Sequence, residues 1–325
     1  MKILNVVNEL LVYSIKQGDK ASVMMNLKKI INPQNRKLLY KILDPLKDEH
    51  VIKLQYRAVL GRKLNLAQPS RFTEKIQWYK LNYRTPLMTK CSDKYEVKNY
   101  LAEKGYAQYI PVLYQVCDKF EEINFEALPN SFVIKCNKGS GTNIIVKDKS
   151  KMNLNEISSV VRSWDKVNTL SIGREWAYKN IIQKIIIEEL LIDSNSPEAG
   201  LNDYKVLCFN GKAHYIWVDV NRYEEHKRNF YDLNWTKIGV VSDHPNFQEK
   251  INKPFGFEEM LNISQEISKD FPFVRVDFYS INSRIYIGEL TFYPWSGTVQ
   301  FTPDDFDYKL GQLFVLPPKK LEGKM

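Results

Sequence analysis

Hydrophobic residues recur with helical spacing through the first part of the chain. In residues 1–60 this pattern appears in LLYKILDPL and VIKLQYRAVL, and it is interrupted at Pro33 and Pro45. The following stretch GRKLNLAQPS, residues 61–70, lacks the pattern. We therefore expect a helical N-terminal extension, broken at the prolines and followed by a connector.

Two further helices are predicted next. The stretch FTEKIQWYKLNY, residues 72–83, is expected to form a helix behind a Ser/Thr-type cap. The stretch SDKYEVKNYLAEKGY, residues 92–106, offers Ser92 or Asp93 as a start and Gly105 as an end. The chain is thus expected to be mainly helical up to this glycine.

Strand patterns dominate the remainder, and the dipeptide Asn210-Gly211 is a strong hairpin signal. No internal repeat or low-complexity tract is present. The fold class is therefore predicted to be α+β. The predicted elements are strands at 131–137 and 143–148, a helix at 153–166, an apolar strand at 184–191, two strands within 203–220, a helix at 257–270 and a strand pair within 274–294.

The composition, 44% hydrophobic and 26% charged, is typical of a soluble globular protein. The start MKILNVVNELLVYS meets Asn and Glu before an apolar run develops, and no stretch reaches the ~20 apolar residues of a spanning helix. We therefore expect a cytoplasmic protein. Scattered cysteines and histidines favour buried reduced thiols over a disulfide framework or a zinc site: Cys91, Cys117, Cys136, Cys208, His50, His214, His226 and His244.

The chain carries 47 Lys and Arg against 38 Asp and Glu, a net charge of +9. Such an excess suits nucleic acid, an anionic membrane surface or an acidic substrate. No nucleic-acid-binding motif supports the first of these partners. A basic surface without a partner stays open beside the other two, because net charge alone specifies no ligand.

The predicted strand pair VRVDFYSINSRIYIGELTF carries charged residues where a core strand would have Val or Ile. A three-residue loop at 281–283, with Asn282 in the left-handed conformation, would set Arg275 opposite Glu289. Asp277 would then be diagonal to Glu289, on the order of 7 Å away, and the two carboxylates could share a magnesium ion with phosphate oxygens. A two-residue loop would place them on opposite faces, and a plain Arg275–Glu289 ion pair is the alternative.

A glycine-bearing loop, KCNKGSGTN at 135–143, separates two predicted strands. Its backbone N–H groups could face phosphate oxygens, although it matches neither the Walker A nor the Rossmann pattern. A plain hairpin turn is the alternative. Lys135 lies inside a strand, where an unpaired ammonium group is costly, so we expect a phosphate partner.

Further polar residues accompany the next two strands. Glu188 and Glu189 follow an apolar run, and Asp203 and Lys205 share one face of a strand. Asp203 could accept ribose hydroxyl groups, and Lys205 could reach a terminal phosphate. Exposed acids at a strand end and a simple ion pair are the alternatives.

In this order the blocks resemble the ATP-grasp superfamily of carboxylate–amine ligases, and most of all the TupA-like (teichuronopeptide biosynthesis) ATP-grasp proteins of bacterial surface-polysaccharide loci. The resemblance covers roughly residues 54–310. It is carried by LNLAQPSRFTEKIQWYKL (64–81), DKYEVKNYL (93–101), LPNSFVIKCNKGSGTNII (128–145), GREWAYKNI (173–181), DYKVLCFNGK (203–212), HKRNFYDLNW (226–235) and VRVDFYSINSRIYIGELTFYP (274–294).

The resemblance implies an ATP-grasp fold, in which two α+β subdomains grip ATP beside a mainly helical N-terminal region. It implies four segments: a helical extension at 1–60, a helical region at 61–130, a small subdomain with the glycine loop at 131–192, and a large subdomain with the metal-binding hairpin at 193–325.

Site residues are implied where the sequence matches the family's motifs. Where many members have Glu-x-Asn at the metal strand, this chain has Glu289-Leu290-Thr291. The implied contacts are Lys135, Ser140, Gly141 and Thr142 with the ATP phosphates, Glu188, Glu189 and Leu191 with adenine, Asp203 with ribose, Lys205 and Arg275 with the transferred phosphoryl group and the acyl phosphate, and Asp277, Glu289 and Thr291 with one or two Mg²⁺ ions.

The implied reaction joins a carboxylate to an amine through an acyl phosphate. We expect a hexuronic acid of a surface polysaccharide or its precursor as the carboxylate, and an amino acid or another amine as the partner. Contact with the inner face of the membrane is a further expectation. The implied substrate contacts are His226, Lys227, Arg228, Ser296 and Gly297, the last two beside Trp295.

Two other functions stay open. A glycosyltransferase would need a D-x-D-like metal motif, for which the nearest acidic pair is Asp304-Asp305. A non-catalytic ATP-binding module is the second, although the intact Lys135, Asp277 and Glu289 argue against it.

Overall fold

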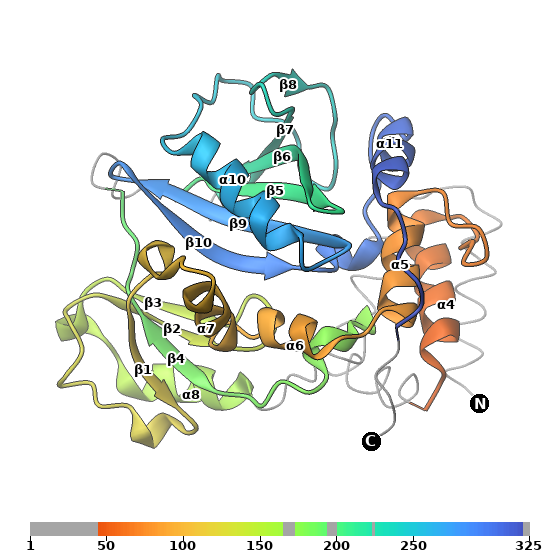
Figure 1. Ribbon diagram of the computed structural model, residues 1–325. Coiled ribbons are helices and arrows are strands. Elements are labelled where there is room, and N and C mark those ends of the chain that lie inside the picture. The colour runs from red at the N-terminus through yellow and green to blue at the C-terminus, as the bar shows by residue number, and fades with distance from the viewer. Residues whose placement is uncertain (1–44, 165–172, 194–199, 223–224, 321–325) are drawn as a thin grey trace.

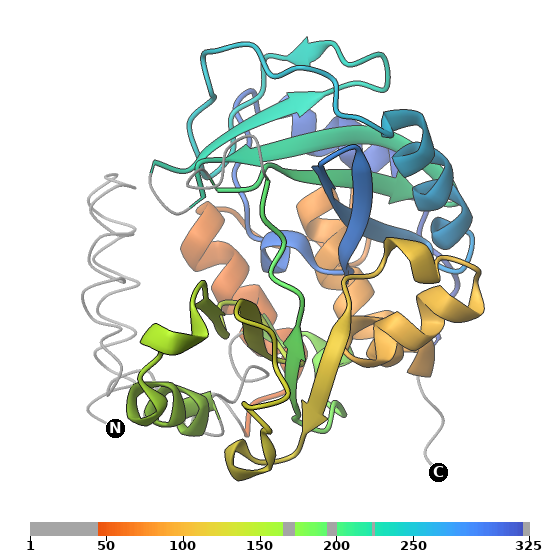
Figure 2. The ribbon, with the colours of Figure 1, turned by 90° about the vertical axis from the view of Figure 1, so that its left-hand side faces the viewer.

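The computed structural model describes residues 45–164, 173–193, 200–222 and 225–320. These residues form two antiparallel sheets with helices around them (Figure 1), which confirms the α+β prediction. The small sheet has strand order β1-β4-β2-β3, and the large sheet has order β10-β9-β5-β6-β7-β8. Figures 1 and 2 both show the large sheet above the small one, with the chain crossing between them after β4.

Four helices precede the first strand in the described part of the chain: α4 (Asp48–Leu60), α5 (Phe72–Asn82), α6 (Pro86–Ser92) and α7 (Glu96–Glu103). The predicted helix at 72–83 is confirmed, but its predicted Ser/Thr cap is wrong. Arg71 is the N-cap residue, and the side chain of Glu74 accepts its backbone N–H at 3.2 Å. Most of the extension expected at 1–60 lies outside the described residues.

The helix predicted at 92–106 is shorter than expected. Its first part belongs to α6, because Pro86 suits the first turn of a helix and Thr85 caps it. The carboxylate of Asp93 then accepts the backbone N–H groups of Tyr95 and Glu96 and starts α7. A 3₁₀ turn, Ala107–Tyr109, follows α7.

The small sheet contains β1 (Leu113–Cys117), β2 (Phe132–Cys136), β3 (Asn143–Val146) and β4 (Ile185–Glu188). Apolar residues of β2 and β4 pack on α8 (Leu154–Trp164) in one core. Strand β1 comes from a segment expected to be helical. Glu188 was expected after the apolar strand but is its last residue, with a buried side chain.

The large sheet contains β5 (Asp203–Phe209), β6 (Lys212–Val220), β7 (Lys227–Tyr231), β8 (Lys237–Ile238), β9 (Phe273–Ile281) and β10 (Arg284–Thr291). The Asn210-Gly211 turn is confirmed, with φ of 50° and 84°. Helix α10 (Phe257–Ser268) covers one face, and α5, α6 and α11 (Asp305–Leu313) join the same core. The sequence did not predict β7.

The β9–β10 hairpin differs from the predicted one in a way that matters for function. Its loop has two residues, Asn282 and Ser283, so the three-residue loop was wrong. A loop of two residues was expected to place Asp277 and Glu289 on opposite faces of the sheet. However, a bulge at Gly288 shifts the register by one residue, so Glu289 pairs directly with Asp277 rather than with Arg275.

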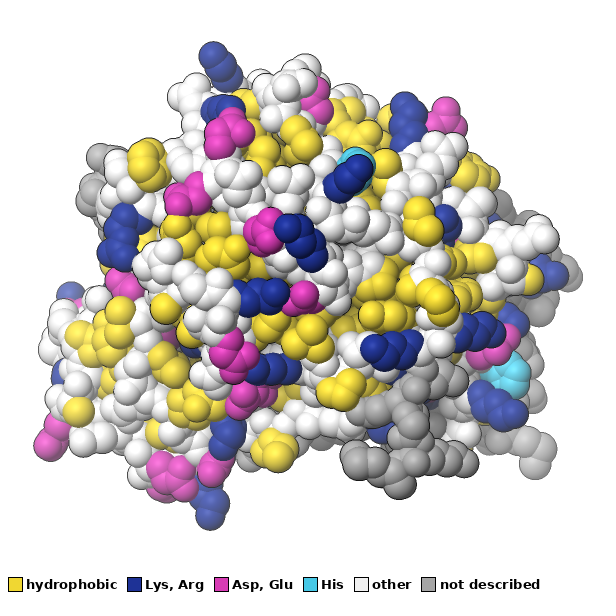
Figure 3. Space-filling model, in the orientation of Figure 1, with side chains coloured by type: hydrophobic (Ala, Val, Ile, Leu, Met, Phe, Trp, Pro, Cys, Tyr) yellow, Lys and Arg dark blue, Asp and Glu magenta, His cyan; other side chains and the backbone are white. Residues whose placement is uncertain are grey.

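The surface and the cysteines add three observations. All four cysteines are buried and free, as expected. No helix within the described ranges is long and apolar enough to cross a membrane. On the face in Figure 3, Lys and Arg are interspersed with Asp and Glu rather than gathered in one patch.

Candidate active site

The charged residues of the large sheet form a row across adjacent strands. Lys205 on β5 pairs in register with Asp277 on β9, which pairs with Glu289 on β10. Lys205 is almost fully buried, and its ammonium contacts Asp203 and lies 3.3 Å from Asp277 and 3.5 Å from Asp219. The sheet thus holds three carboxylates around one buried lysine.

Arg275 completes this cluster. Its Nε donates to Asp277 Oδ1 at 2.6 Å, and its Nη2 lies 3.0 Å from Glu289 Oε1. The Arg275–Glu289 ion pair that we had considered as an alternative is therefore present, together with the carboxylate pair. Thr291 donates its hydroxyl to Glu289 Oε1 at 3.3 Å and so orients that carboxylate.

The two carboxylates differ in their proton affinity. Burial raises the pKa of Asp277 to about 7, against the opposing effect of Arg275 and Lys205. Burial also acts on Glu289, but Arg275, Lys94 and Lys205 outweigh it and lower its pKa. A divalent cation between these groups would favour the ionised form of both.

These residues fit magnesium bound to a nucleotide rather than a free metal ion. No group of three or more His, Cys, Asp or Glu in the described ranges could hold a metal by itself. Asp277 and Glu289 supply two carboxylates, and magnesium commonly takes its remaining ligands from phosphate and water. Asp203 Oδ1 is buried with no hydrogen-bond partner among the described residues, as expected of an acceptor that awaits a ligand.

The small sheet supplies a second charged group. Lys135 on β2 is paired with Glu188 on β4, and Lys98 on α7 lies 3.0 Å from Glu188. Burial raises the pKa of Glu188, but the two lysines outweigh it, so the net effect lowers that pKa. Glu188 thus balances the charge of the ammonium group of Lys135, for which a phosphate partner was expected.

The segment after β4 is held by its own contacts. Glu189 Oε2 accepts the backbone N–H of Val112 at 3.2 Å, so this side chain is bound to the residue that precedes β1. Leu191 is half-buried, and Asn282 at the tip of the β9–β10 hairpin donates to the carbonyl of Ile192 at 3.2 Å. The hairpin of the large sheet therefore contacts the segment that follows β4 directly.

The glycine loop is bound at its base to the turn between α6 and α7, and it is open at its tip. Asn137 donates to Asp93 at 2.8 Å, and Lys94 donates to the carbonyl of Gly139. Ser140 and Gly141 are exposed, and Gly141 has φ +73° with open space around the position of a Cβ. Thr142 Oγ1 is buried without a hydrogen-bond partner in the described part.

Lys94 connects this loop with the large sheet. Its ammonium affects the pKa of Glu289, and Glu289 affects the pKa of Lys94. Burial lowers the pKa of Lys94, and Glu289 opposes that effect. The glycine loop and the carboxylate pair therefore lie within electrostatic reach of one another.

Aromatic and basic side chains adjoin the carboxylates. Trp217 stacks on Trp295 with ring centroids 4.2 Å apart, and Arg275 lies 5.0 Å from the Trp217 ring. Arg228 lies 5.2 Å from the Trp295 ring and donates to Asp219 Oδ1 at 2.6 Å. His226 Nε2 lies 3.1 Å from the same Asp219 oxygen.

Not every predicted substrate contact reaches this cluster. The backbone and side-chain oxygens of Ser296 accept from Lys80, and Gly297 O accepts from Gln77, so both residues are bound to α5. Lys227 is paired with the exposed Glu225 at 2.9 Å. His226 and Arg228 remain as candidates.

The sequence reasoning missed several residues of the site. Trp217 and Asp219 are two positions apart on β6 and therefore lie on the same face of the strand. The alternation of residues in this strand could have identified them. Lys94 precedes α7 and Lys98 lies within it. The hydrophobic pattern of this helix does not indicate that either lysine contacts the small sheet or its glycine loop. Arg222 reaches Asp203 at 2.6 Å from a loop and had no signal either.

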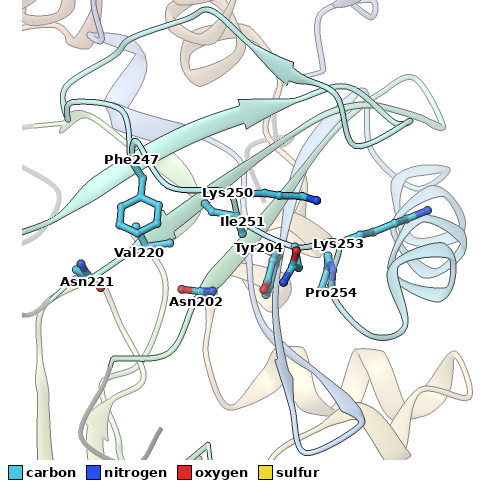
Figure 4. A pocket seen from close by; sticks show the side chains of 10 residues that line it. Asn202, Tyr204, Val220, Asn221, Phe247, Lys250, Ile251, Lys253 and Pro254 are labelled. Atoms are coloured by element: carbon cyan, nitrogen blue, oxygen red, sulfur yellow. The ribbon is translucent and has the colours of Figure 1, made fainter. Parts of the chain in front are cut away.

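A cavity of about 370 Å³ lies elsewhere, on the other face of the large sheet (Figure 4). Its lining comes from the ends of β5 and β6, with Tyr204 and Val220, and from the loop at 247–254. Tyr204 points away from its neighbours Asp203 and Lys205, because side chains alternate along a strand. We therefore do not assign this cavity to the carboxylate cluster.

A family model described as TupA-like ATPgrasp matches residues 74–315, well over half of the chain. The comparison with curated proteins gave no match. Similar solved structures include D-alanine–D-alanine ligase from Bacillus anthracis, with 22% identity, a TM-score of 0.37, and coverage of 62% of this chain and 56% of that chain. Less than two thirds of that ligase is thus covered.

Two further structures show the same level of similarity. D-Alanine–D-alanine ligase from Helicobacter pylori has 18% identity and a TM-score of 0.44, with coverage of 76% of this chain and 70% of that one. The ATP-grasp ligase PsnB, complexed with a precursor variant, Mg and ADP, has 12% identity and a TM-score of 0.38, with coverage of 67% and 57%.

Proposed function

The chain belongs to the TupA-like ATP-grasp family, and from this premise we propose that it is an ATP-dependent carboxylate–amine ligase. The proposed products are an amide, ADP and phosphate. The observation that carries the proposal is the pairing of Asp277 with Glu289 beside Lys205 and Arg275 on one face of the large sheet. Two carboxylates and two cations there suit phosphoryl transfer to a carboxylate.

Each part of the site has a proposed role. Lys135 and the glycine loop at 140–142 bind the ATP phosphates, and the exposed loop tip closes over them. Asp203 accepts ribose hydroxyl groups through its unpartnered Oδ1, while Glu188, Glu189 and Leu191 border the adenine. Asp277 and Glu289 hold magnesium, and Thr291 orients Glu289.

The chemistry follows from charge and position. Magnesium, when bound with ATP, neutralises charge on the transferred phosphoryl group. Lys205 and Arg275 stabilise the negative oxygens of the acyl phosphate, and Arg275 also faces the oxyanion that forms when the amine attacks. Positioning and electrostatics supply the rate acceleration, so the reaction needs no nucleophilic Ser or Cys.

We propose a hexuronic acid of a bacterial surface polysaccharide, or its precursor, as the carboxylate substrate. The net charge of +9 suits an anionic sugar, and Arg228 beside the two stacked tryptophans offers a cation and a flat apolar surface. The amine partner is an amino acid or another small amine. We place this reaction in the cytoplasm, where ATP is supplied, at or near the inner face of the membrane.

The acidic residue Asp304, which the glycosyltransferase alternative would use to bind a metal, has other partners. Asp304 is paired with Arg62 at 2.8 Å and with Arg71 at 2.6 Å, so its carboxylate already has two cationic partners. This arrangement explains Asp304 as part of the packing between α5 and α11.

The test measures nucleotide products with Mg²⁺ across a panel of uronic acids and sugar nucleotides, each with mixed amines. We expect ADP and phosphate only when a uronate and an amine are both present. Consumption of a sugar nucleotide without ATP would overturn the ligase proposal.

A further inference from the structure

His226 and Asp219 form a pair that the phosphoryl-transfer step does not use. His226 Nε2 lies 3.1 Å from Asp219 Oδ1 and makes no well-aligned hydrogen bond within the described residues. The imidazole is mostly buried, with 21% of its side chain exposed, and stacks on His244 with ring centroids 3.6 Å apart. One edge of the ring therefore faces a carboxylate while part of the ring reaches solvent.

Asp219 is built to remain an anion. It is almost fully buried, and burial alone would raise its pKa, but Lys205 and Arg228 outweigh burial and lower that pKa. A charged carboxylate facing Nε2 favours the tautomer that carries the proton on this nitrogen and orients the ring. The lone pair of His226 is then on Nδ1.

The pair adjoins the reacting groups. Asp219 Oδ2 lies 3.5 Å from the ammonium of Lys205, which lies 3.3 Å from Asp277. Asp219 thus shares one lysine with a proposed magnesium carboxylate. His226 is one contact further out, toward the cluster of Arg228 and the stacked tryptophans.

The other charged groups around the ring are already paired. Arg228 binds Asp219 and Asp243, and Lys227 is paired with Glu225. Asp243 lies 3.4 Å from His244 Nε2, and burial lowers the pKa of His244 against the opposing effect of Asp243. Asp219 is therefore the carboxylate that faces Nε2 of His226.

Resting on the proposed ligase function, we propose that His226 is the general base of amide formation and that Asp219 is its positioning residue. A neutral amine nitrogen bonds to the acyl carbon of the acyl phosphate. The proton that this nitrogen then carries moves to Nδ1 of His226. The bond between the acyl carbon and the phosphate oxygen breaks, and phosphate leaves with the electron pair.

The experiment compares two nucleophiles on the acyl phosphate. Hydroxylamine is unprotonated at neutral pH and traps acyl phosphates as hydroxamates without a general base, whereas alanine requires one. The assay contains the full chain, ATP, Mg²⁺ and glucuronic acid with either nucleophile. We expect His226→Gln to lose amide formation by about 10²-fold or more and to keep hydroxamate formation within about threefold.

Two further variants sharpen the test. Asp219→Asn should show the same selective loss to a smaller extent, because the imidazole loses only its orienting charge. His244→Gln is the matched control and should keep both products.

Equal loss of both products in His226→Gln would overturn the base assignment in favour of a binding role. If neither product were lost, His226 would have no role in the reaction. If the wild-type protein formed no hydroxamate with any uronic acid of the panel, the ligase proposal itself would fail.

Discussion

Asp277 and Glu289 are directly paired across the β9–β10 hairpin although the loop between their strands has only two residues. Without a bulge, Gly288 would occupy the position opposite Asp277 and Glu289 would face the other side of the sheet. A Cβ at Gly288 would lie 3.1 Å from Tyr279 Cε2, tighter than most such contacts. The carboxylate pair therefore depends on a small residue at this one position.

Asp277→Asn should reduce Mg²⁺-dependent ADP formation by at least about 10²-fold, because the amide neither carries charge nor balances Arg275. ADP release and circular dichroism of the same samples separate lost chemistry from lost folding. Asp270→Asn is the control, because Asp270 follows α10, outside the β9–β10 hairpin, and is paired with Lys104 at the end of α7. An unchanged rate in Asp277→Asn would refute the metal assignment.

Lys135→Met should weaken ATP binding by roughly 10-fold or more, because a charge-assisted phosphate contact is lost. Calorimetric titration with a non-hydrolysable ATP analogue measures the effect. Lys151→Met, at an exposed lysine, should bind like wild type. If Lys135→Met/Glu188→Gln, which removes the Glu188 charge as well, restored full affinity, Lys135 would serve only to pair with Glu188.

Lys80 should give stability a distinct pH dependence. It is buried, and burial lowers its pKa to about 8 despite Glu175. Between pH 8 and 10.5 the unfolded chain holds a proton that the folded chain has lost, so stability rises with pH in this window.

Relative to Lys80→Met, the wild-type free energy of unfolding should therefore increase by up to about 3 kcal/mol from pH 8 to 10.5. Urea denaturation of both proteins across this range measures the difference. If the difference in the free energy of unfolding stayed constant with pH, burial would not lower the pKa of Lys80.

Asp307 and Asp304 should differ strongly in their effect on stability. Asp307 is fully buried and accepts from the backbone and hydroxyl of Thr73 at 2.9 and 2.8 Å, with Arg62 at 3.0 Å. Asp307→Ala should cost roughly 3–5 kcal/mol because it leaves the buried N–H of Thr73 without an acceptor and removes one of the two carboxylates paired with Arg62.

Asp304 is half exposed, so Asp304→Ala should cost only about 0.2–1 kcal/mol and should keep ADP formation. Chemical denaturation and the ADP assay give both values. Loss of ADP formation in folded Asp304→Ala would return the acidic pair to consideration as a metal motif.

Local patterns predicted the elements whose partners lie close in the chain. The Asn210-Gly211 turn and the helix at 257–270 were found because each signal is contained in a few residues. The resemblance added the expected nucleotide-site residues, and the structure places three of them, Lys205, Asp277 and Glu289, in register on adjacent strands.

The misses have physical causes of another kind. Strand β7 begins with polar residues, and Arg228 becomes buried only because Asp219 and Asp243 from other segments pair with it. The bulge at Gly288 cannot be recognised from the alternation of hydrophobic and polar residues, because it shifts the pairing register while the residues themselves stay the same. Lys98 reaches Glu188 only through the packing of α7 on the small sheet.

The stacked Trp217 and Trp295 give the molecule an optical property of its own. Because the two ring centroids are 4.2 Å apart, next to Arg228 and Arg275, we expect the indoles to absorb and emit as a coupled pair. Any ligand that shifts either guanidinium group or the Trp295 turn changes the environment of this pair. Ultraviolet fluorescence and near-ultraviolet circular dichroism would then follow occupancy in real time, with no label attached and without waiting for turnover.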